Sequence, residues 1–211
     1  MMQDIIKQFV FLWSVIDPIG TVPVFLALAS AYTDNAMRRR LALKATFVAM
    51  LVLMFFVVAG EFLLDAMSIP LPAFQIAGGI VLFIFAMTMM FGDSKPEAEL
   101  DMIKKGMHTA VFPLAIPSIA SPGAMMAAVL LTDNHRFSLQ HQIITSLIIL
   151  SVLAVTLIFM LLGSHILKII GEAGASVISR VMGLILASVA VNAVLVGIQV
   201  FFNLQPFTDA L

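Results

Sequence analysis

The stretch Asp17-Pro18-Ile19-Gly20-Thr21-Val22-Pro23 interrupts a long apolar run, and Pro117-Ser118-Ile119-Ala120-Ser121-Pro122-Gly123-Ala124 interrupts another in the second half of the chain. Proline removes a backbone donor and collides with the preceding helical turn, so each stretch breaks a helix. Each also begins one, because Asp17 and Ser121 are favoured N-cap residues and are followed by proline, which suits the first helical position. We therefore expect two membrane segments broken near mid-membrane, each with a helix N-terminus inside the protein.

The composition predicts an integral membrane protein. Of the 211 residues, 62% are hydrophobic and 11% are charged, and the mean hydropathy is +1.11. A soluble domain is about half apolar and about a quarter charged. The net charge of −1 gives no reason to expect a nucleic-acid partner. The chain has no cysteine, which excludes disulfides and thiolate metal sites, and we expect neither a metal nor a cofactor.

Six apolar stretches have the roughly 20 residues that a membrane helix requires. They lie near 8–31, 41–64, 72–91, 108–131, 142–163 and 177–202. If the loops alternate between two sides, one side carries Lys7 and Arg136, and the other carries Arg38, Arg39, Arg40, Lys44, Lys95, Lys104, Lys105, Lys168 and Arg180. Basic residues gather in cytoplasmic loops. The richer side is therefore predicted to be cytoplasmic and both termini periplasmic.

The two halves of the chain resemble each other. Three pairs share nearly one offset, namely Pro18 with Pro122 at 104, Gly60 with Gly163 at 103, and Gly78 with Gly183 at 105. We expect two three-helix repeats, residues 1–91 and 108–211, joined by a cytoplasmic linker at 92–107. Because each repeat crosses the membrane three times, the second is inverted. The predicted fold is an all-α polytopic membrane protein with six transmembrane segments in two inverted repeats, a pattern typical of secondary transporters.

Further motifs are spread over the whole chain: Ala77-Gly78-Gly79-Ile80, Pro113-Leu114-Ala115-Ile116-Pro117 and Gly183-Leu184-Ile185-Leu186, in addition to Asp17-Pro18-Ile19-Gly20 with Pro23 and Ser121-Pro122-Gly123-Ala124. With these motifs the sequence resembles the MarC family of bacterial inner-membrane proteins. The resemblance implies a six-helix protein, and some relatives are assigned to the transport of small neutral amino acids. Many members have asparagine in place of Asp17 and glycine in place of Ser121, which leaves the substrate and the coupling ion open.

The two breaks together suit an amino-acid zwitterion. A helix N-terminus offers unpaired N–H groups and partial positive charge to an anion. We expect the N–H groups of Gly123 and Ala124 to receive the substrate carboxylate and Asp17 to face the ammonium group. Gly20 and Gly123 permit close backbone approach, because they lack a β-carbon. The candidate substrate-binding residues are Asp17, Pro18, Gly20, Thr21, Ser118, Ser121, Pro122, Gly123, Ala124 and Asn192.

Several of these residues have a second interpretation. Prolines and glycines are also typical of membrane helices that merely kink against their neighbours. Asp17 is a candidate for carrying a coupling proton, whereas no motif for sodium is legible. Asn192 equally suits a hydrogen bond to a neighbouring helix. The four histidines lack metal-ligand spacing, and we expect His108, His135, His141 and His165 at the surface.

We therefore predict a secondary transporter of small neutral solutes such as alanine or glycine, working by alternating access around a midplane site. Its partners would be the substrate, a proton or sodium ion, and the lipid bilayer; the oligomeric state is open. An enzyme is not expected, because Asp17 is the only deeply placed carboxylate and a catalytic aspartyl pair is missing. Two rival functions are a flippase for lipids or lipid-linked carriers and a non-transporting helper of other membrane proteins.

Overall fold

The computed structural model describes residues 2–30, 32, 34–91, 112–132 and 138–204, and every regular element in these ranges is a helix. In chain order they are α1 (Met2–Ile16), α2 (Pro18–Ala29), α3 (Asn35–Ala66), α4 (Leu71–Phe91), the short π-helix η1 (Leu114–Ile119), α6 (Pro122–Leu131), α7 (Leu139–Leu161) and α8 (Gly163–Phe201). Five stretches are long and apolar enough to cross a membrane: Asp4–Ala29, Asn35–Ala66, Leu71–Phe91, Leu139–Leu161 and Ala173–Phe201. The all-helical, multi-span class predicted from the sequence is confirmed.

The segment expected at 108–131 is divided. Its described part begins at Phe112, η1 ends at Ile119, and α6 starts only at Pro122. At about 1.5 Å per residue, α6 alone is about 15 Å long, roughly half of the hydrocarbon core. Pro117 and Pro122 explain the division, since neither can continue a regular helix from the preceding turn.

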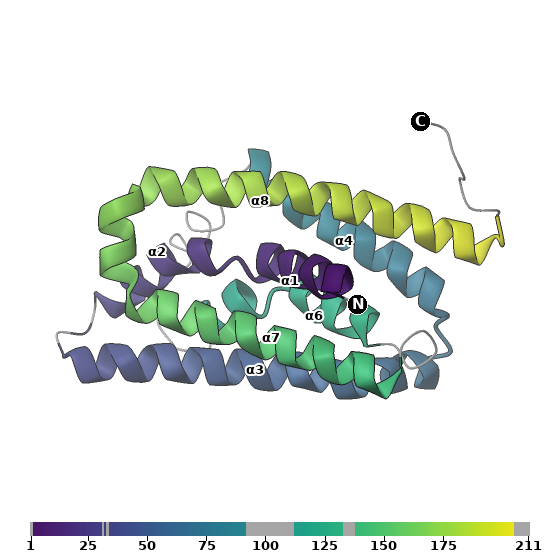
Figure 1. Ribbon diagram of the computed structural model, residues 1–211, viewed down its shortest axis with the longest axis horizontal. Coiled ribbons are helices and arrows are strands. Elements are labelled where there is room, and N and C mark those ends of the chain that lie inside the picture. Colours follow the sequence, from purple (N-terminus) through teal and green to yellow (C-terminus); the bar gives the residue numbers. More distant parts are fainter. Residues whose placement is uncertain (1, 31, 33, 92–111, 133–137, 205–211) are drawn as a thin grey trace.

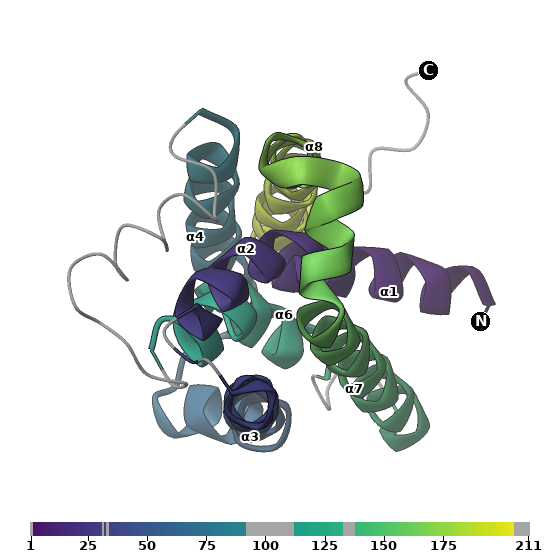
Figure 2. The ribbon, with the colours of Figure 1, turned by 90° about the vertical axis from the view of Figure 1, so that its left-hand side faces the viewer.

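The two broken segments lie at the centre of the molecule. Figures 1 and 2 show α1, α2 and α6 between α4 and α8 on one side and α3 and α7 on the other. In the most apolar 18-residue window of Asp4–Ala29, 67% of the residues are buried, compared with 22% in Asn35–Ala66. The segment that contains the helix break is therefore the core around which the unbroken helices pack.

The first turns of α3 replace part of a predicted loop. The segments expected at 8–31 and 41–64 leave Arg38, Arg39 and Arg40 in the loop between them, but all three lie inside α3. The helix begins early because Asp34 caps it, its Oδ1 accepting a hydrogen bond from the Ala36 N–H at 2.9 Å. Arginine is a good helix former, so the cap extends the helix through the basic run.

A second predicted loop, residues 164–176, is also helical. Residues 163–170 form the first part of α8 and cross the end of the bundle before the long part begins (Figures 1 and 2). The turn between the two parts occurs at Gly171, which has φ 73° and ψ 165°. That conformation is essentially restricted to glycine, so one residue redirects the helix.

The helices α4 and α8 run side by side at close range. A Cβ on Gly79 would lie 2.9 Å from the Ala190 carbonyl oxygen, and one on Gly183 would lie 2.9 Å from Met89 Cβ and 3.2 Å from the Ala86 carbonyl oxygen. Backbones approach this closely only where side chains are absent, as in other membrane helix pairs.

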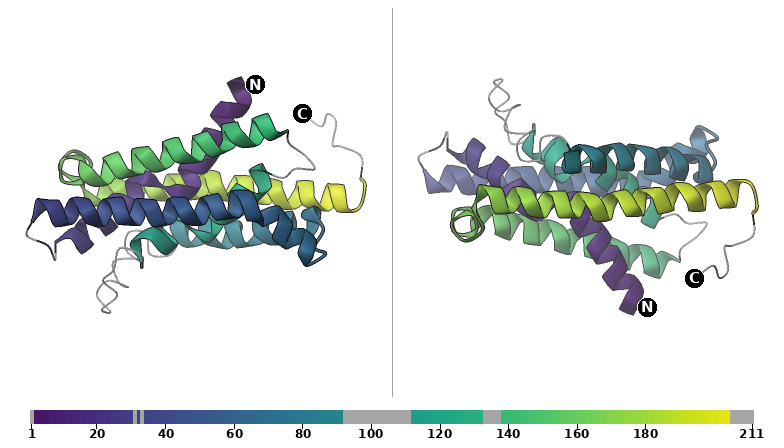
Figure 3. Two further views of the ribbon diagram at one scale, coloured as in Figure 1. Left: turned by 90° about the horizontal axis from the view of Figure 1, so that it is seen from below. Right: turned by 90° about the horizontal axis from the view of Figure 1, so that it is seen from above.

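The predicted cytoplasmic linker, 92–107, lies outside the described residues, as does Arg136. Two groups of described basic residues lie at one end: Figure 1 shows the start of α3, which carries Arg38 to Arg40, at the same end of the bundle as residues 163–170, which carry Lys168. Figure 3 shows the N-terminal end of α1 projecting away from the other helices. The assignment of the basic end to the cytoplasm stays a prediction.

We expect Gly79→Ala to lower the free energy of unfolding by about 1–3 kcal/mol, because the added methyl group would force the α4 and α8 backbones apart. Ala77→Val, on the exposed face of the same helix, is the matched control. The midpoint of thermal unfolding in detergent, followed by the fluorescence of Trp13, measures both changes. Equal midpoints for the two variants would contradict the close contact.

Candidate functional site

The first break is confined to Asp17. Its N–H donates to the Trp13 carbonyl oxygen at 2.8 Å and completes α1, while its own carbonyl oxygen accepts from the Thr21 N–H at 3.1 Å and begins α2. Asp17 has φ 50° and ψ 71°, a left-handed conformation that aspartate tolerates better than most residues. Its Oδ1 accepts from the Gly20 N–H at 3.0 Å. The predicted N-cap is confirmed, and the side chain is 1% exposed.

The second break lies between η1 and α6. Ser121 caps α6, its Oγ accepting from the Ala124 N–H at 3.1 Å, and Pro122 occupies the first helical position as predicted. On the other side of the break, the Ser118 and Ala120 N–H groups donate to the carbonyl oxygens of Pro113 and Ala115. The peptide bonds before Pro113 and Pro117 are both cis.

The two breaks contact each other through side-chain hydroxyls. Ser121 Oγ donates to the Val15 carbonyl oxygen at 3.2 Å, which belongs to the last turn of α1. Ser118 Oγ lies 3.5 Å from Thr21 Oγ1, and Thr21 Oγ1 donates to the Asp17 carbonyl oxygen at 3.0 Å. Ser118, Ser121 and Thr21 are completely buried. Helix ends from both halves of the chain therefore form one buried polar cluster.

Ser179 of α8 completes this cluster and was missed by the sequence analysis. Its Oγ donates to Asp17 Oδ2 at 2.8 Å, and its side chain is fully buried. A signal was present, because Ser179 shares a helical face of small residues with Ala175, Gly183, Ala187 and Ala190, all of which are buried. A small polar residue on such a face is a candidate partner for a buried carboxylate.

The space beside each break glycine is filled by protein. A Cβ on Gly20 would overlap the Asp17 carboxylate and lie 2.5 Å from Ser179 Oγ. One on Gly123 would lie 2.6 Å from Leu82 Cδ1 and 3.0 Å from Val15 Cγ1. Glycine at these positions permits the carboxylate–serine contact at the first break and the packing of α1 and α4 against the second.

The structure brings together most of the predicted site residues, but not all. Those gathered around the breaks and buried are Asp17, Pro18, Gly20, Thr21, Ser118, Ser121, Gly123 and Ala124. Pro122 belongs to the second break but is exposed. Asn192 lies elsewhere, exposed on α8, where it lines a separate cavity of about 500 Å³ with Lys7, Gln8 and Phe11 among others.

A second polar cluster joins α1 to α7. Gln8 Nε2 lies 2.7 Å from His141 Nε2, and Thr145 Oγ1 donates to Gln8 Oε1 at 3.1 Å. Gln8 and Thr145 are buried and His141 is half-buried, so His141 is not the simple surface residue that its place in the sequence suggested. Polar side chains in a membrane helix usually form hydrogen bonds with one another, because the membrane interior offers no water.

Metal binding has no support in the described part of the chain, where no three His, Cys, Asp or Glu side chains group closely enough to hold an ion. Asp17 is the single carboxylate of the central cluster. What the cluster can do is exchange hydrogen bonds: its amides and hydroxyls donate to anions, and Asp17 accepts from cationic or neutral donors.

Comparison with known proteins gives one family over nearly the whole chain. The family model described as "MarC family integral membrane protein" matches residues 2–202. The UPF0056 inner membrane protein YhgN of Escherichia coli K12 is 30% identical over 202 residues, which covers 96% of this chain and 100% of YhgN. The UPF0056 membrane protein YvbG of Bacillus subtilis is 33% identical over 207 residues, covering 96% and 97%.

The similarity extends to archaea. A UPF0056 membrane protein of Archaeoglobus fulgidus is 31% identical over 200 residues, covering 90% of each chain. No solved structure matches this chain.

We expect Ser121→Ala to destabilise the protein more than Ser138→Ala. Losing an N-cap serine costs about 1 kcal/mol, and the buried Val15 carbonyl oxygen would lose this donor at a further cost of about 1–3 kcal/mol. Ser138 caps α7 at an exposed position, where its Oγ accepts from the His141 N–H at 3.4 Å, an interaction within its own helix. Thermal unfolding in detergent compares them. Equal shifts would show that Ser121 acts only as a local cap.

Proposed function

Because this chain belongs to the MarC family of integral membrane proteins, we propose that it is a secondary transporter of small neutral solutes, such as alanine or glycine, in the bacterial inner membrane. The observation that carries the proposal is the buried polar cluster of Asp17, Thr21, Ser118, Ser121 and Ser179, built from helix breaks at the centre of a membrane-spanning bundle. Interrupted segments in corresponding positions are the usual place of a transporter's binding site. The location is supported by the name of the E. coli relative.

The six-segment inverted repeat is part of this proposal. It pairs α1–α2 with η1–α6, α3 with α7, and α4 with α8. The directions of the paired helices support the inverted repeat. In Figure 1, α3 and α7 run in opposite directions along the bundle, and so do α4 and α8. Two halves of opposite orientation can exchange roles, which gives a physical route to alternating access around the cluster where they meet.

Substrate enters by replacing internal hydrogen bonds. The substrate carboxylate takes the place of Ser121 Oγ at the Ala124 N–H and reaches the neighbouring Gly123 N–H. The substrate ammonium takes the place of Ser179 Oγ at Asp17 Oδ2. The bonds from Ser121 to Val15 and from Ser179 to Asp17 hold helices together when the site is empty. Exchanging them for bonds to the substrate couples binding to helix movement.

Asp17 is the proposed coupling residue. A buried carboxylate that alternates between Ser179 and a cation can carry a proton, or hold sodium, through the transport cycle. No covalent chemistry is proposed, because the cluster holds only one carboxylate and its serines bond to backbone groups, to Thr21 or to Asp17.

One observation favours the lipid-carrier alternative. The cavity of about 500 Å³ between α1 and α8 is lined largely by apolar side chains, with Lys7 as its basic residue. Ile6, Val10 and Ile185 line it and are exposed, so it faces outward beside the projecting end of α1 (Figure 3). A sideways cavity with a basic residue suits an amphiphile rather than a free amino acid. A substrate bound at the helix breaks would support amino-acid transport, whereas a substrate bound in this cavity would support the lipid-carrier function.

The decisive experiment is counterflow in liposomes. Vesicles containing the purified protein are preloaded with unlabelled alanine or glycine, and uptake of the labelled compound is measured with and without a proton gradient. We expect exchange above protein-free vesicles. No exchange by a preparation that unfolds cooperatively would contradict amino-acid transport and leave the lipid or helper functions.

We expect Asp17→Asn to reduce exchange at least tenfold, because asparagine retains the cap but offers no charge to the ammonium group or proton. Asp34→Asn is the matched control, since Asp34 is also an N-cap aspartate but is exposed at the start of α3. Initial rates of counterflow at several pH values compare the variants. An Asp17→Asn protein with an unchanged rate and pH profile would rule out the charged role.

A further inference from the structure

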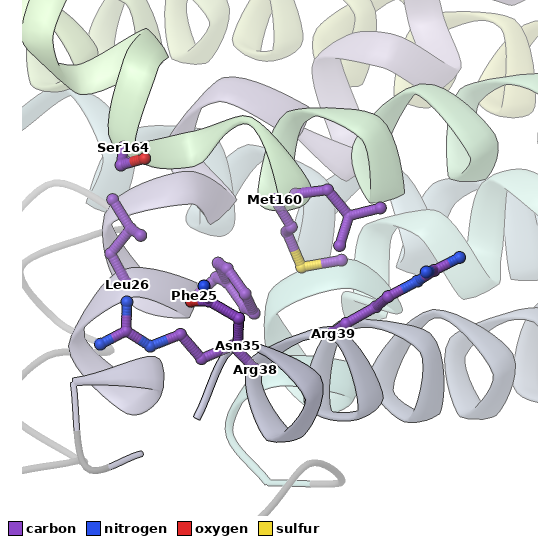
Figure 4. Close-up of a pocket in the computed structure, with 8 residues that line it drawn as sticks. Phe25, Leu26, Asn35, Arg38, Arg39, Met160 and Ser164 are labelled. Carbon is purple, nitrogen blue, oxygen red and sulfur yellow. The ribbon is translucent and has the colours of Figure 1, made fainter. Parts of the chain in front are cut away.

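A separate polar feature lies at the end of the bundle where α3 begins and α7 ends. A cavity of about 270 Å³ is formed there by residues of α2, α3, α7 and the first turn of α8 (Figure 4). Its polar side chains are Asn35, Arg38, Arg39 and Ser164, and its apolar wall includes Phe25 and Met160. None of these residues takes part in the central cluster.

The two arginines are held differently. Arg38 is half-buried, and its Nε donates to the Tyr32 carbonyl oxygen at 2.9 Å, which fixes the guanidinium plane. Figure 4 shows Arg38 directed to the side of Leu26 and Arg39 to the opposite side. Within the described part of the chain neither guanidinium has an ion pair. Two cationic groups therefore flank the cavity, and none of the described residues that line it is acidic.

The acidic residue nearest in sequence does not remove this charge. Asp34 precedes the cavity residues and caps α3, where its Oδ1 accepts a hydrogen bond from the Ala36 N–H, but it contributes only one negative charge. The first turns of α3 carry a net positive charge, because a single aspartate precedes Arg38, Arg39 and Arg40. An exposed basic run is usually only solvated or a topology signal; here two of its members line a cavity with an apolar wall.

The lining selects the chemistry of a ligand. Guanidinium forks match phosphate oxygens with paired hydrogen bonds, and the Asn35 amide and Ser164 hydroxyl add neutral donors. The apolar wall suits hydrocarbon, which a simple inorganic anion lacks. At about 270 Å³ the cavity is slightly smaller than typical small-molecule pockets of roughly 300 Å³ or more. A volume of this size has room for a phosphate and its ester group, and a longer hydrocarbon tail would lie outside the cavity.

We propose that this cavity binds a phosphate ester, with the phosphate at the Arg39 side of the cavity, close to the positive charge of Arg38, and the ester carbons against Phe25 and Met160. The bilayer supplies such a group as the headgroup of an anionic phospholipid; the aqueous phase supplies it as a soluble phosphate ester. The elements that line the cavity include the start of α3 and the first turn of α8, which lie at the same end of the bundle (Figure 1). Anionic headgroups are attracted to clustered arginines.

The test compares Arg39→Gln with Arg40→Gln. Both changes remove one positive charge from neighbouring exposed positions of α3, but only Arg39 lines the cavity. The full-length protein is stripped of lipid and titrated with phosphatidylglycerol or phosphatidylcholine, and bound lipid is counted by native mass spectrometry. We expect wild type and Arg40→Gln to prefer phosphatidylglycerol, and Arg39→Gln to bind it about tenfold more weakly, since a charge-assisted hydrogen bond is lost.

A competition arm distinguishes the two sources. Displacement of phosphatidylglycerol by millimolar glycerol 3-phosphate would assign the cavity to a soluble ester, and no displacement would assign it to lipid. Equal weakening in both variants would mean that only the general charge of α3 acts and would overturn the proposal. Equal binding of the two lipids by the wild type, with no binding of glycerol 3-phosphate, would also overturn it. Neither outcome depends on whether the protein transports amino acids.

Discussion

The hydrogen bond from Ser121 Oγ to the Val15 carbonyl oxygen gives a partner to a backbone group at a helix end, which every helix end at the centre of the protein requires. A helix break releases amides on one side and carbonyls on the other, and the apolar interior offers no water to receive them. Ser121 serves both kinds of group, because its hydroxyl accepts from Ala124 in its own helix and donates to α1. Each break thus depends on the other for its stability.

Asp17 also gives partners to groups at the first break, and it does so with a carboxylate that itself needs hydrogen-bond donors. One carboxylate oxygen caps α2 and the other accepts from Ser179 in α8, so α2 and the sequence-distant α8 meet at one side chain. Satisfying a buried carboxylate requires such partners, and bonds that link separate helices are the ones whose exchange moves helices. Such a cluster would respond to the zwitterion proposed as its substrate, because that molecule offers the same kinds of donor and acceptor.

The sequence was sufficient where local chemistry decides structure. Asp17 and Ser121 before proline predicted both caps and both interruptions, since capping needs only neighbouring residues. It was insufficient where tertiary contacts decide. Ser179 bonds to Asp17, which is 162 positions away in the sequence. Asn192 lies on the exposed side of α8, away from the central cluster. The loops expected at 32–40 and 164–176 became partly helical because Asp34 supplied a cap and Gly171 absorbed the turn in a single residue.

The short helix α2 connects the two sites physically. Its first turn is capped by Asp17, and its last turns carry Phe25 and Leu26, which line the arginine cavity. At about 1.5 Å per residue its 12 residues span about 18 Å. Rotation of α2 as one body about Asp17 would displace Phe25 and Leu26 relative to Arg38. If the proposed phosphate ester and the proposed substrate each shift α2, their binding free energies are coupled, and the effect of either ligand on the other is equal.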